Sequence, residues 1–185
     1  MLATRRTDAA VNRERILRAA RAALAESGDA PLNAIARQAG IGQGTLYRHF
    51  GSREELVLAV HRADVGDLVD LAPRLLAQRP PLDALRAWLE SLADYGRLKH
   101  GLSGAMYVAT REQLHQEGYT PIVDAMTMLL GAGQAAHLLR PDVDGEDLLV
   151  LVGFLWRTAP RPDWQDHNRR LLDVVIDGLR VHPAS

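Results

Sequence analysis

Residues 35–56 read IARQAGIGQGTLYRHFGSREEL, and they are the most informative stretch of this 185-residue chain. Apolar residues recur at helical spacing on both sides of Gly40, and glycine favours the left-handed conformation in which many helices end. The pattern predicts two short helices joined by a tight turn. A third helix is expected to begin at Ser52, because Ser52 and Glu55 have the spacing of a capping box.

The second of these helices carries polar side chains beside two apolar ones. Leu46 and Phe50 are four residues apart, so we expect both to face inward and to leave the polar residues outside. Glutamine can bond adenine, threonine can bond a base or touch a thymine methyl, and tyrosine and histidine can reach phosphates. A helix-turn-helix places its second helix in the major groove of DNA. The candidate DNA-contacting residues are therefore Gln43, Gly44, Thr45, Tyr47, Arg48, His49 and, at the start of the third helix, Arg53.

These motifs resemble the N-terminal signature of the TetR (tetracycline-repressor-like) family of bacterial transcription regulators. The resemblance covers about residues 10–60. It implies an N-terminal three-helix DNA-binding domain and a C-terminal helical domain that binds a small molecule and dimerises through its last two helices. The motifs that carry it are ILRAA at 16–20, IA at 35–36, AG at 39–40, GTLYRHF at 44–50 and SREEL at 52–56.

Two positions depart from the family pattern. Family members often carry Ser or Thr at the start of the second helix, where the hydroxyl caps the helix, whereas this chain has Ala30 and Pro31. We therefore expect Asp29 or the Ala30 backbone to cap that helix. Gly42 stands where a serine is common, which removes one polar contact from the turn.

Charge is distributed unevenly along the chain. Residues 1–62 contain ten arginines and six acidic residues, whereas the remainder has twelve basic and seventeen acidic residues. A basic end on an acidic body suits a protein that docks on DNA with one end. We expect residues 1–10 to form a flexible arm, in which Arg5 and Arg6 follow the DNA backbone or enter a minor groove.

Composition also limits the class of protein. The apolar share of 47% supports a packed core, and the absence of cysteine excludes disulfides and thiol chemistry and fits a reducing cytoplasm. Neither a signal-peptide pattern nor a membrane-length apolar run is present, so we expect a cytoplasmic protein without a membrane partner.

No strand-like alternation stands out, and the whole chain is predicted to be all-α, with about nine helices. We expect a helix-turn-helix domain over residues 1–56 and a helical effector-binding and dimerisation domain over residues 57–185. The helices expected outside the turn motif are 11–27, 52–69 with a possible extension to 76, 82–99, 103–112, 121–139, 146–157 and 164–179.

The helices expected at 146–157 and 164–179 are apolar on more than one face. A helix of that kind must be buried on more than one face. A homodimer that packs these helices from two copies would cover the excess surface. The alternative is that both helices are central in the monomer.

The predicted body also offers large apolar side chains with a few polar tips, which is the composition of a small-molecule pocket. At helical spacing, the same residues also suit an ordinary core. The candidates for contact with an unidentified effector are Trp88, Tyr95, Met106, Tyr107, Met126 and Phe154.

Enzyme chemistry has little support in the sequence. The seven histidines form no HExxH pair, Ser103 does not lie in a GxSxG elbow, and no glycine-rich phosphate loop appears. We therefore expect no enzyme, metal or cofactor. The resulting prediction is a ligand-responsive repressor that binds a palindromic operator as a dimer. The alternative is a helical small-molecule-binding or scaffold protein whose helix-turn-helix head no longer binds DNA.

Overall fold

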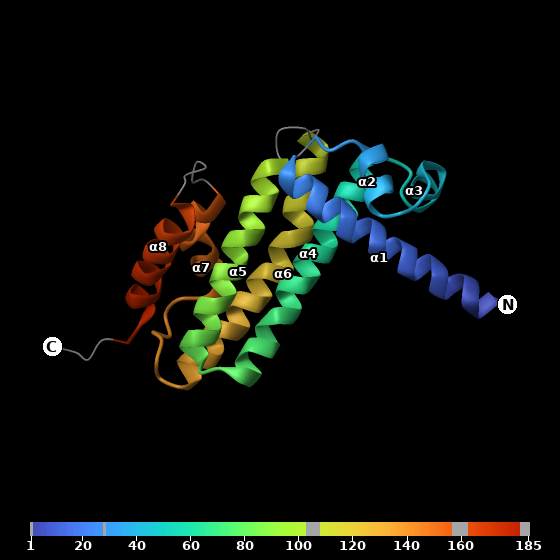
Figure 1. Cartoon of the computed structure of the whole chain (residues 1–185). Coiled ribbons are helices and arrows are strands. Elements are labelled where there is room, and N and C mark those ends of the chain that lie inside the picture. Colours follow the sequence, from blue (N-terminus) through green and yellow to red (C-terminus); the bar gives the residue numbers. More distant parts are fainter. Residues whose placement is uncertain (1, 28, 103–107, 157–162, 182–185) are drawn as a thin grey trace. The chain divides into compact units, whose positions relative to one another are not determined.

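In a computed structural model, the backbone is described for residues 2–27, 29–102, 108–156 and 163–181, and side chains for residues 10–27, 29–96, 116–155 and 163–181. This part of the chain forms eight α-helices and a short 3-10 helix, so the predicted all-α class is confirmed (Figure 1). None of its helices is both long enough and apolar enough to span a membrane. The elements are α1 (Leu2–Glu26), α2 (Leu32–Gln38), α3 (Gln43–His49), α4 (Arg53–Gln78), α5 (Pro81–Leu102), α6 (Val108–Ala135), α7 (Gly145–Leu151), η1 (Gly153–Trp156) and α8 (Trp164–Leu179).

Helix α1 is longer than the sequence pattern predicted. It begins at Leu2 rather than near Val11, so the backbone of residues 2–10 is helical where we expected a flexible arm. This segment contains no glycine or proline and is rich in alanine and arginine, which are strong helix formers. Its helical propensity therefore extends α1 beyond the apolar face that marked the predicted start.

Helix α6 replaces the two helices expected at 103–112 and 121–139. It runs without interruption from Val108 through Pro121 to Ala135, while residues 103–107 lie outside the described part of the chain. The gap expected between residues 112 and 121 was wrong. Proline inside a helix costs about 3 kcal/mol or more. The apolar side chains that follow, including Met126 and Leu129, are fully buried and offset that cost.

The helix expected at 146–157 is also different in the structure. Helix α7 ends at Leu151, and a 3-10 turn continues from Gly153 to Trp156. Gly153 has low helix propensity, and the tighter turn still buries Leu155, whose N–H donates to the Val152 carbonyl at 2.9 Å. Helix α8, in contrast, has the bounds that the sequence predicted.

The chain divides into two compact units, which we call the head (residues 1–64 and 98–115) and the body (residues 65–97 and 116–185). Helix α4 supplies buried residues to both, from Leu56 to Val60 in the head and from Val65 to Leu75 in the body. The boundary predicted between residues 56 and 57 stays a prediction. The buried residues of the head core are Ile16, Ala19, Ala20, Leu24, Ala30, Ile35, Ala36, Ala39, Leu46, Phe50, Leu56, Val57, Ala59 and Val60.

Within the body, α5 and α6 run side by side, and α7 and α8 lie beside α5 (Figure 1). Trp88, on α5, is fully buried, and its indole Nε1–H donates to the Leu68 carbonyl of α4 at 2.8 Å. Arg86 of α5 forms an ion pair with Asp173 of α8. These two contacts fix α5 against a helix that precedes it and a helix that follows it in the chain.

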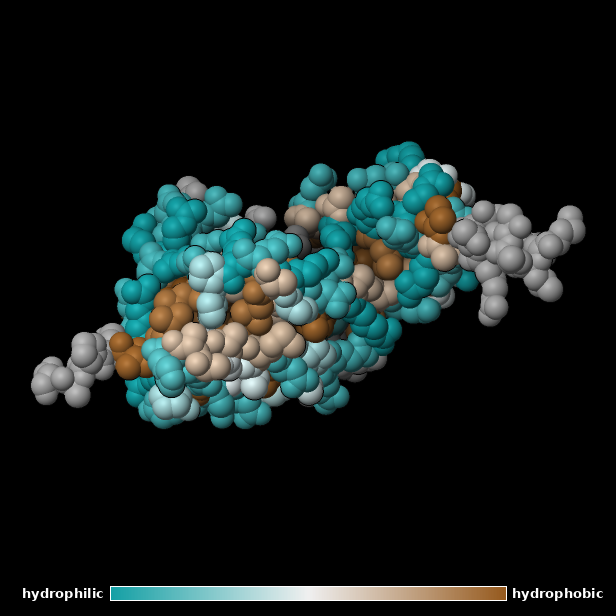
Figure 2. All heavy atoms as spheres, turned by 90° about the horizontal axis from the view of Figure 1, so that it is seen from below, coloured by the Kyte–Doolittle hydropathy of each residue, from teal (hydrophilic) through white to brown (hydrophobic). Residues whose placement is uncertain are grey.

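The outer faces of α7 and α8 carry apolar side chains that the body does not cover. Val150 is 80% exposed, Val174 is 69% exposed and Leu151 is 50% exposed. Figure 2 shows apolar atoms gathered on one face of the body among hydrophilic surroundings. An exposed apolar patch of this kind is typical of a surface that contacts another molecule.

Candidate nucleic-acid interface

The turn between α2 and α3 is built around Gly40. Its φ angle is +66°, a left-handed conformation that glycine adopts without the steric penalty of a Cβ atom. The Gly40 N–H donates to the Arg37 carbonyl at 3.1 Å, and the Ile41 N–H donates to the Ala36 carbonyl at 3.0 Å. These bonds satisfy carbonyls at the end of α2, so the predicted helix stop is confirmed.

Helix α3 is held down by the two apolar residues that the sequence identified. Leu46 is fully buried and Phe50 is 1% exposed, as predicted. The guanidinium of Arg13, on α1, lies over the Phe50 ring with its Cζ atom 5.0 Å from the ring centroid. This cation–π contact was not expected from the sequence, and it brings a basic residue of α1 next to the end of α3.

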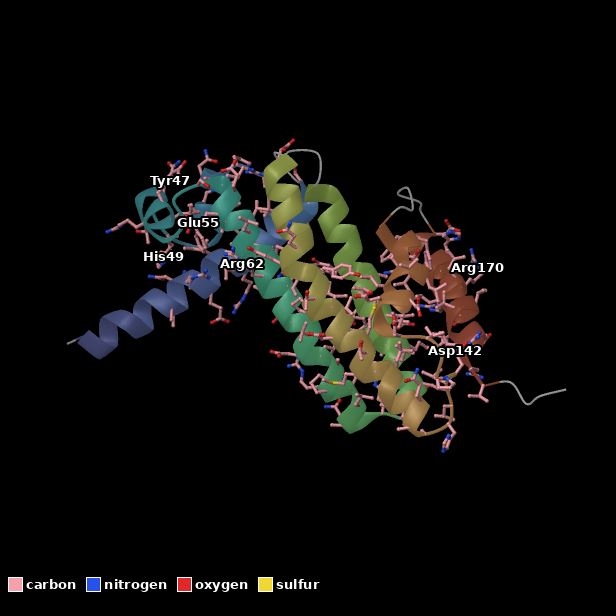
Figure 3. All side chains as sticks on the ribbon, turned by 180° about the vertical axis from the view of Figure 1, so that it is seen from behind. Tyr47, His49, Glu55, Arg62, Asp142 and Arg170 are labelled. Atoms are coloured by element: carbon pink, nitrogen blue, oxygen red, sulfur yellow. The ribbon has the colours of Figure 1, made fainter. Side chains whose placement is uncertain are left out.

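The polar residues of α3 lie on its outer faces. Tyr47 is 47% exposed, Gln43 and Arg48 are exposed, and Thr45 and His49 are half-buried. Figure 3 shows Tyr47 and His49 leaving α3 on different sides. The two side chains predicted to contact DNA therefore lie on separate faces of one helix.

Three of the predicted DNA-contacting residues are bonded together. The Arg48 guanidinium donates to the Thr45 hydroxyl oxygen at 3.1 Å and to the Gly44 carbonyl at 3.2 Å. Arg48 is thus folded back along its own helix. A base contact by either side chain requires this pair to rearrange, or requires the arginine to keep one N–H group on Thr45 while another reaches DNA.

Arg53, expected to contact phosphate, has a structural partner as well. Its Nη1 donates to the carbonyl oxygen of Ala30 at 2.5 Å. Ala30 precedes α2, whose N-cap residue is Pro31 with no side-chain hydrogen bond. The expected cap from Asp29 or the Ala30 backbone was therefore wrong, because α2 starts one residue later than Pro31. Instead, Arg53 secures this turn from a position 23 residues further along the chain.

The start of α4 has the predicted cap with one change. The Glu55 N–H donates to the Ser52 hydroxyl at 3.1 Å, but the Glu55 carboxylate accepts from the Gly51 N–H at 2.8 Å rather than from the Ser52 N–H. The neighbouring Glu54 carboxylate accepts from its own backbone N–H and from the Ser52 hydroxyl, and both bonds lower the pKa of Glu54. The helix N-terminus thereby gains a nearby negative charge, which its dipole stabilises.

The residues predicted to contact an effector lie mainly inside the body core. Trp88 and Met126 are fully buried, Tyr95 is 7% exposed, and Phe154 is half-buried against the same core. Met106 and Tyr107 lie outside the described part of the chain. The pocket found beside α8 is lined by none of these residues, so their contact with an effector stays a prediction.

Among the described residues, no group of three or more His, Cys, Asp or Glu side chains is placed to hold a metal ion. The described polar groups of the head instead form hydrogen bonds and ion pairs within helices, at helix starts and between helices. The head therefore offers a supported helix with exposed hydrogen-bonding groups, which is the arrangement that groove recognition requires.

Comparisons with known proteins agree on both parts of the chain. The family model described as "Bacterial regulatory proteins, tetR family" matches residues 16–60. The model described as "Transcriptional regulator SbtR-like, C-terminal domain" matches residues 80–181. Among curated proteins, the HTH-type transcriptional repressor AcnR of Corynebacterium diphtheriae is 25% identical in an alignment 189 positions long that covers 97% of each chain.

Solved structures extend the likeness over nearly the full length. A TetR transcriptional regulator from Streptomyces coelicolor is 39% identical, with a TM-score of 0.81 over 92% of this chain and 99% of that one. A TetR regulatory protein from Mycobacterium vanbaalenii is 33% identical, with a TM-score of 0.73 over 95% of this chain and 99% of that one. Sequence and fold therefore point to the same group of proteins.

Proposed function

Because this chain belongs to the TetR family of bacterial transcription regulators, we propose that it represses transcription by binding a palindromic DNA operator as a homodimer. A small-molecule effector then releases it. The matched families and relatives are regulators rather than enzymes. Operator binding would place the protein in the bacterial cytoplasm.

The observation that carries this proposal is the orientation of α3. Leu46 and Phe50 are buried while Tyr47 is 47% exposed, so the helix presents polar groups outward from a fixed base. Gln43, Thr45, Tyr47 and Arg48 would lie nearest the bases, where amide, hydroxyl and guanidinium groups can bond base edges. His49 and Arg53 would bind phosphates, since imidazole and guanidinium N–H groups can donate to phosphate oxygens. Gly44 would let the DNA backbone approach α3 closely.

Dimerisation is supported by the apolar faces of α7 and α8. Val150, Leu151 and Val174 are exposed, and a two-fold packing of these helices against a second copy would cover them. Two recognition helices would then read half-sites about 34 Å apart, one helical turn of DNA. A palindromic operator would follow from the two-fold symmetry of such a dimer.

Release by an effector requires a conformational change that reaches the head. Helix α4 supplies buried residues to the head core and to the body core, so a displacement of its body end would move its head end as well. An effector that prefers one of two states shifts the population toward that state. A hundredfold loss of operator affinity needs a coupling free energy of roughly 2.7 kcal/mol.

The test is an operator-binding assay with the DNA upstream of the protein's own gene. The double variant Tyr47→Ala, His49→Ala should lose binding while keeping its helicity and its dimer mass. Asp70→Ala, an exposed change on the body segment of α4, is the control and should bind as the parent does. Undiminished binding by the double variant would remove the assignment of α3.

The salt dependence of operator affinity gives a second test in the same assay. If several phosphates are neutralised, the logarithm of affinity should fall steeply and linearly with the logarithm of salt concentration. The rival function, a small-molecule-binding or scaffold protein with an inactive head, predicts no specific operator complex at any salt concentration. A flat salt response would favour that rival.

A further inference from the structure

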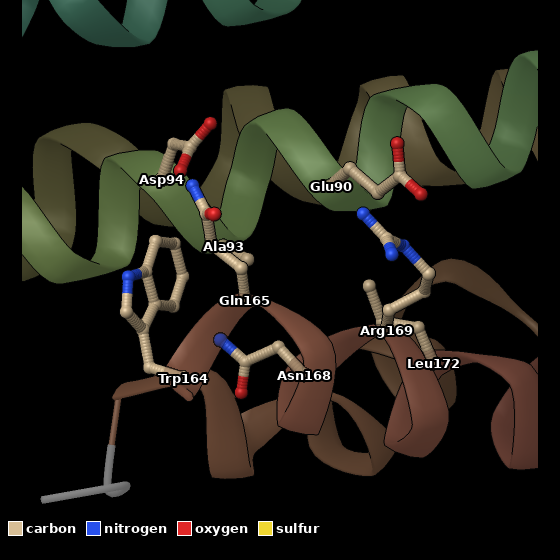
Figure 4. Close-up of a pocket in the computed structure, with 8 residues that line it drawn as sticks. All are labelled: Glu90, Ala93, Asp94, Trp164, Gln165, Asn168, Arg169 and Leu172. Carbon is tan, nitrogen blue, oxygen red and sulfur yellow. The ribbon is translucent and has the colours of Figure 1, made fainter. Parts of the chain in front are cut away.

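Helices α5 and α8 leave a pocket between them in the body. It has a volume of about 210 Å³. This is smaller than a drug-sized site, which is about 300–1,000 Å³. Figure 4 shows side chains from both helices around it. The residues that line it are Glu90, Ala93, Asp94, Trp164, Gln165, Asn168, Arg169 and Leu172.

The pocket arises from the register of the two helices. The Arg86–Asp173 ion pair joins the two helices, one helical turn before Glu90 on α5 and one turn after Arg169 on α8. From there, successive turns of α5 meet earlier turns of α8, so Glu90 lies opposite Arg169 and Asp94 lies opposite Gln165 (Figure 4). Between these side chains, α5 contributes only the small Ala93, which leaves room beside Asn168.

Asn168 is the unusual residue of this wall. It is 5% exposed, and its Oδ1 is a buried side-chain oxygen without a hydrogen-bond partner in the described part of the chain. Such an acceptor loses its hydration without compensation. In Figure 4 the amide nitrogen faces Gln165 and the oxygen is turned away. The χ2 angle of asparagine is broad and roughly two-fold, so a half-turn exchanges the two ends of the amide and brings the oxygen to the pocket.

The charged side chains that line the pocket are two carboxylates and one guanidinium. Glu90 and Asp94 contribute two carboxylates from α5. The one cation in the lining, Arg169, donates to Asp166 of its own helix at 3.2 Å. The indole of Trp164 forms another part of the wall, and aromatic faces attract cations.

We propose that this pocket binds a small organic cation with N–H groups, a primary ammonium being the simplest case. Its N–H groups donate to the Asp94 carboxylate and to Asn168 Oδ1 after the amide has turned. Its apolar part lies against Trp164 and Leu172. This site is separate from the residues predicted to contact the effector, and the inference does not depend on DNA binding.

The test is calorimetric titration of the full-length protein with n-butylammonium at constant ionic strength. We expect saturable binding with a Kd on the order of 1 mM, since the probe is small. Tetramethylammonium carries the same charge without an N–H donor, and it should bind at least roughly tenfold more weakly. Butyrate, an anion of similar size, should not bind. Equal binding of the two cations, or no binding of n-butylammonium, would overturn the proposal.

Two variants locate the site. Asn168→Leu should raise the melting temperature of the ligand-free protein, because it removes the unpaired oxygen, and should weaken n-butylammonium binding by about tenfold or more. Asp94→Asn should weaken binding without a large change in stability, because Asp94 is exposed. Asp83→Asn is the matched control on the same helix, roughly 16 Å away along its axis, and should bind as the parent does. Unchanged binding in both test variants would exclude this pocket as the site.

Discussion

Arg53, in the first turn of α4, donates a hydrogen bond from Nη1 to the backbone carbonyl of Ala30 at 2.5 Å. Ala30 is 8% exposed, so its carbonyl has little access to water. One side chain thus holds together the turn before α2 and the start of α4. Because α3 lies between these two elements in the chain, the contact supports the frame from which α3 projects.

Loss of this contact should destabilise the head. Arg53→Met keeps much of the side-chain length but leaves the Ala30 carbonyl unpaired, at a cost of about 1–3 kcal/mol. Urea unfolding followed by circular dichroism measures this change. Arg74→Met, an exposed arginine on the same helix, is the control and should change stability by less than about 0.5 kcal/mol. Equal stability of the two variants would mean that the hydrogen bond from Arg53 to Ala30 makes no net contribution to the free energy of unfolding.

The glycines at 40 and 44 should respond in opposite directions to alanine. At Gly40 the φ of +66° disfavours alanine, so Gly40→Ala should destabilise the protein by about 1–2 kcal/mol. A Cβ atom there would also lie 2.7 Å from the Arg15 guanidinium, although that flexible side chain can move. Thermal unfolding measures the loss.

Gly44 lies inside α3, and a Cβ atom there meets no atom within 4 Å. Gly44→Ala should therefore stabilise the protein by about 0.4–1 kcal/mol through the unfolded state. If DNA approaches α3 closely, the same change should weaken operator binding. Stabilisation with unchanged affinity would place the DNA backbone away from Gly44.

The Glu54 carboxylate should add a pH-dependent contribution to stability. Its pKa is lowered in the folded protein, so its contribution is present above the unfolded pKa and is lost as pH falls through the folded pKa. Glu54→Gln should therefore lower the urea midpoint at about pH 7 and have a smaller effect at about pH 3. In a Ser52→Ala background this pH dependence should shrink, because the hydroxyl that bonds the carboxylate is gone. A constant difference at both pH values would assign the effect to helix propensity.

The exposed valines of α7 and α8 should control the oligomeric state. Val174→Asp, combined with Val150→Asp, places charge on the apolar surface that a second copy would cover, and should give a folded monomer in sedimentation equilibrium. Val11→Asp makes the same change at an exposed valine of α1, and should leave the mass unchanged. A parent protein that is already monomeric would contradict the proposed dimer.

The features that were predicted correctly from the sequence all depend on residues that are close together along the chain. The left-handed Gly40, the inward Leu46 and Phe50, and the bond from the Glu55 N–H to Ser52 all depend on residues within about one helical turn. Backbone sterics and helical spacing act over that distance, so a single sequence contains the needed information. The specificity of the motif string also made the family recognisable.

The errors arose where local propensity competed with packing. A separate helix was expected to begin at Pro121, but α6 continues through this residue and buries the apolar face that follows it. Asp29 was a plausible cap for α2, but α2 begins after Pro31 and the turn is secured from Arg53 instead. Neither outcome is visible in a window of a few residues, because the deciding partners come from other elements.

The local pattern of this sequence was sufficient to identify the helix that faces outward, the residues that anchor it and the family to which the chain belongs. Packing in three dimensions decided which partners those residues have: Arg13 over Phe50, Arg53 on Ala30, and the meeting of α5 with α8 that creates the pocket beside Asn168. The physical reason is separation along the chain. Periodicity and capping describe neighbours, whereas contacts between distant residues depend on how whole helices pack.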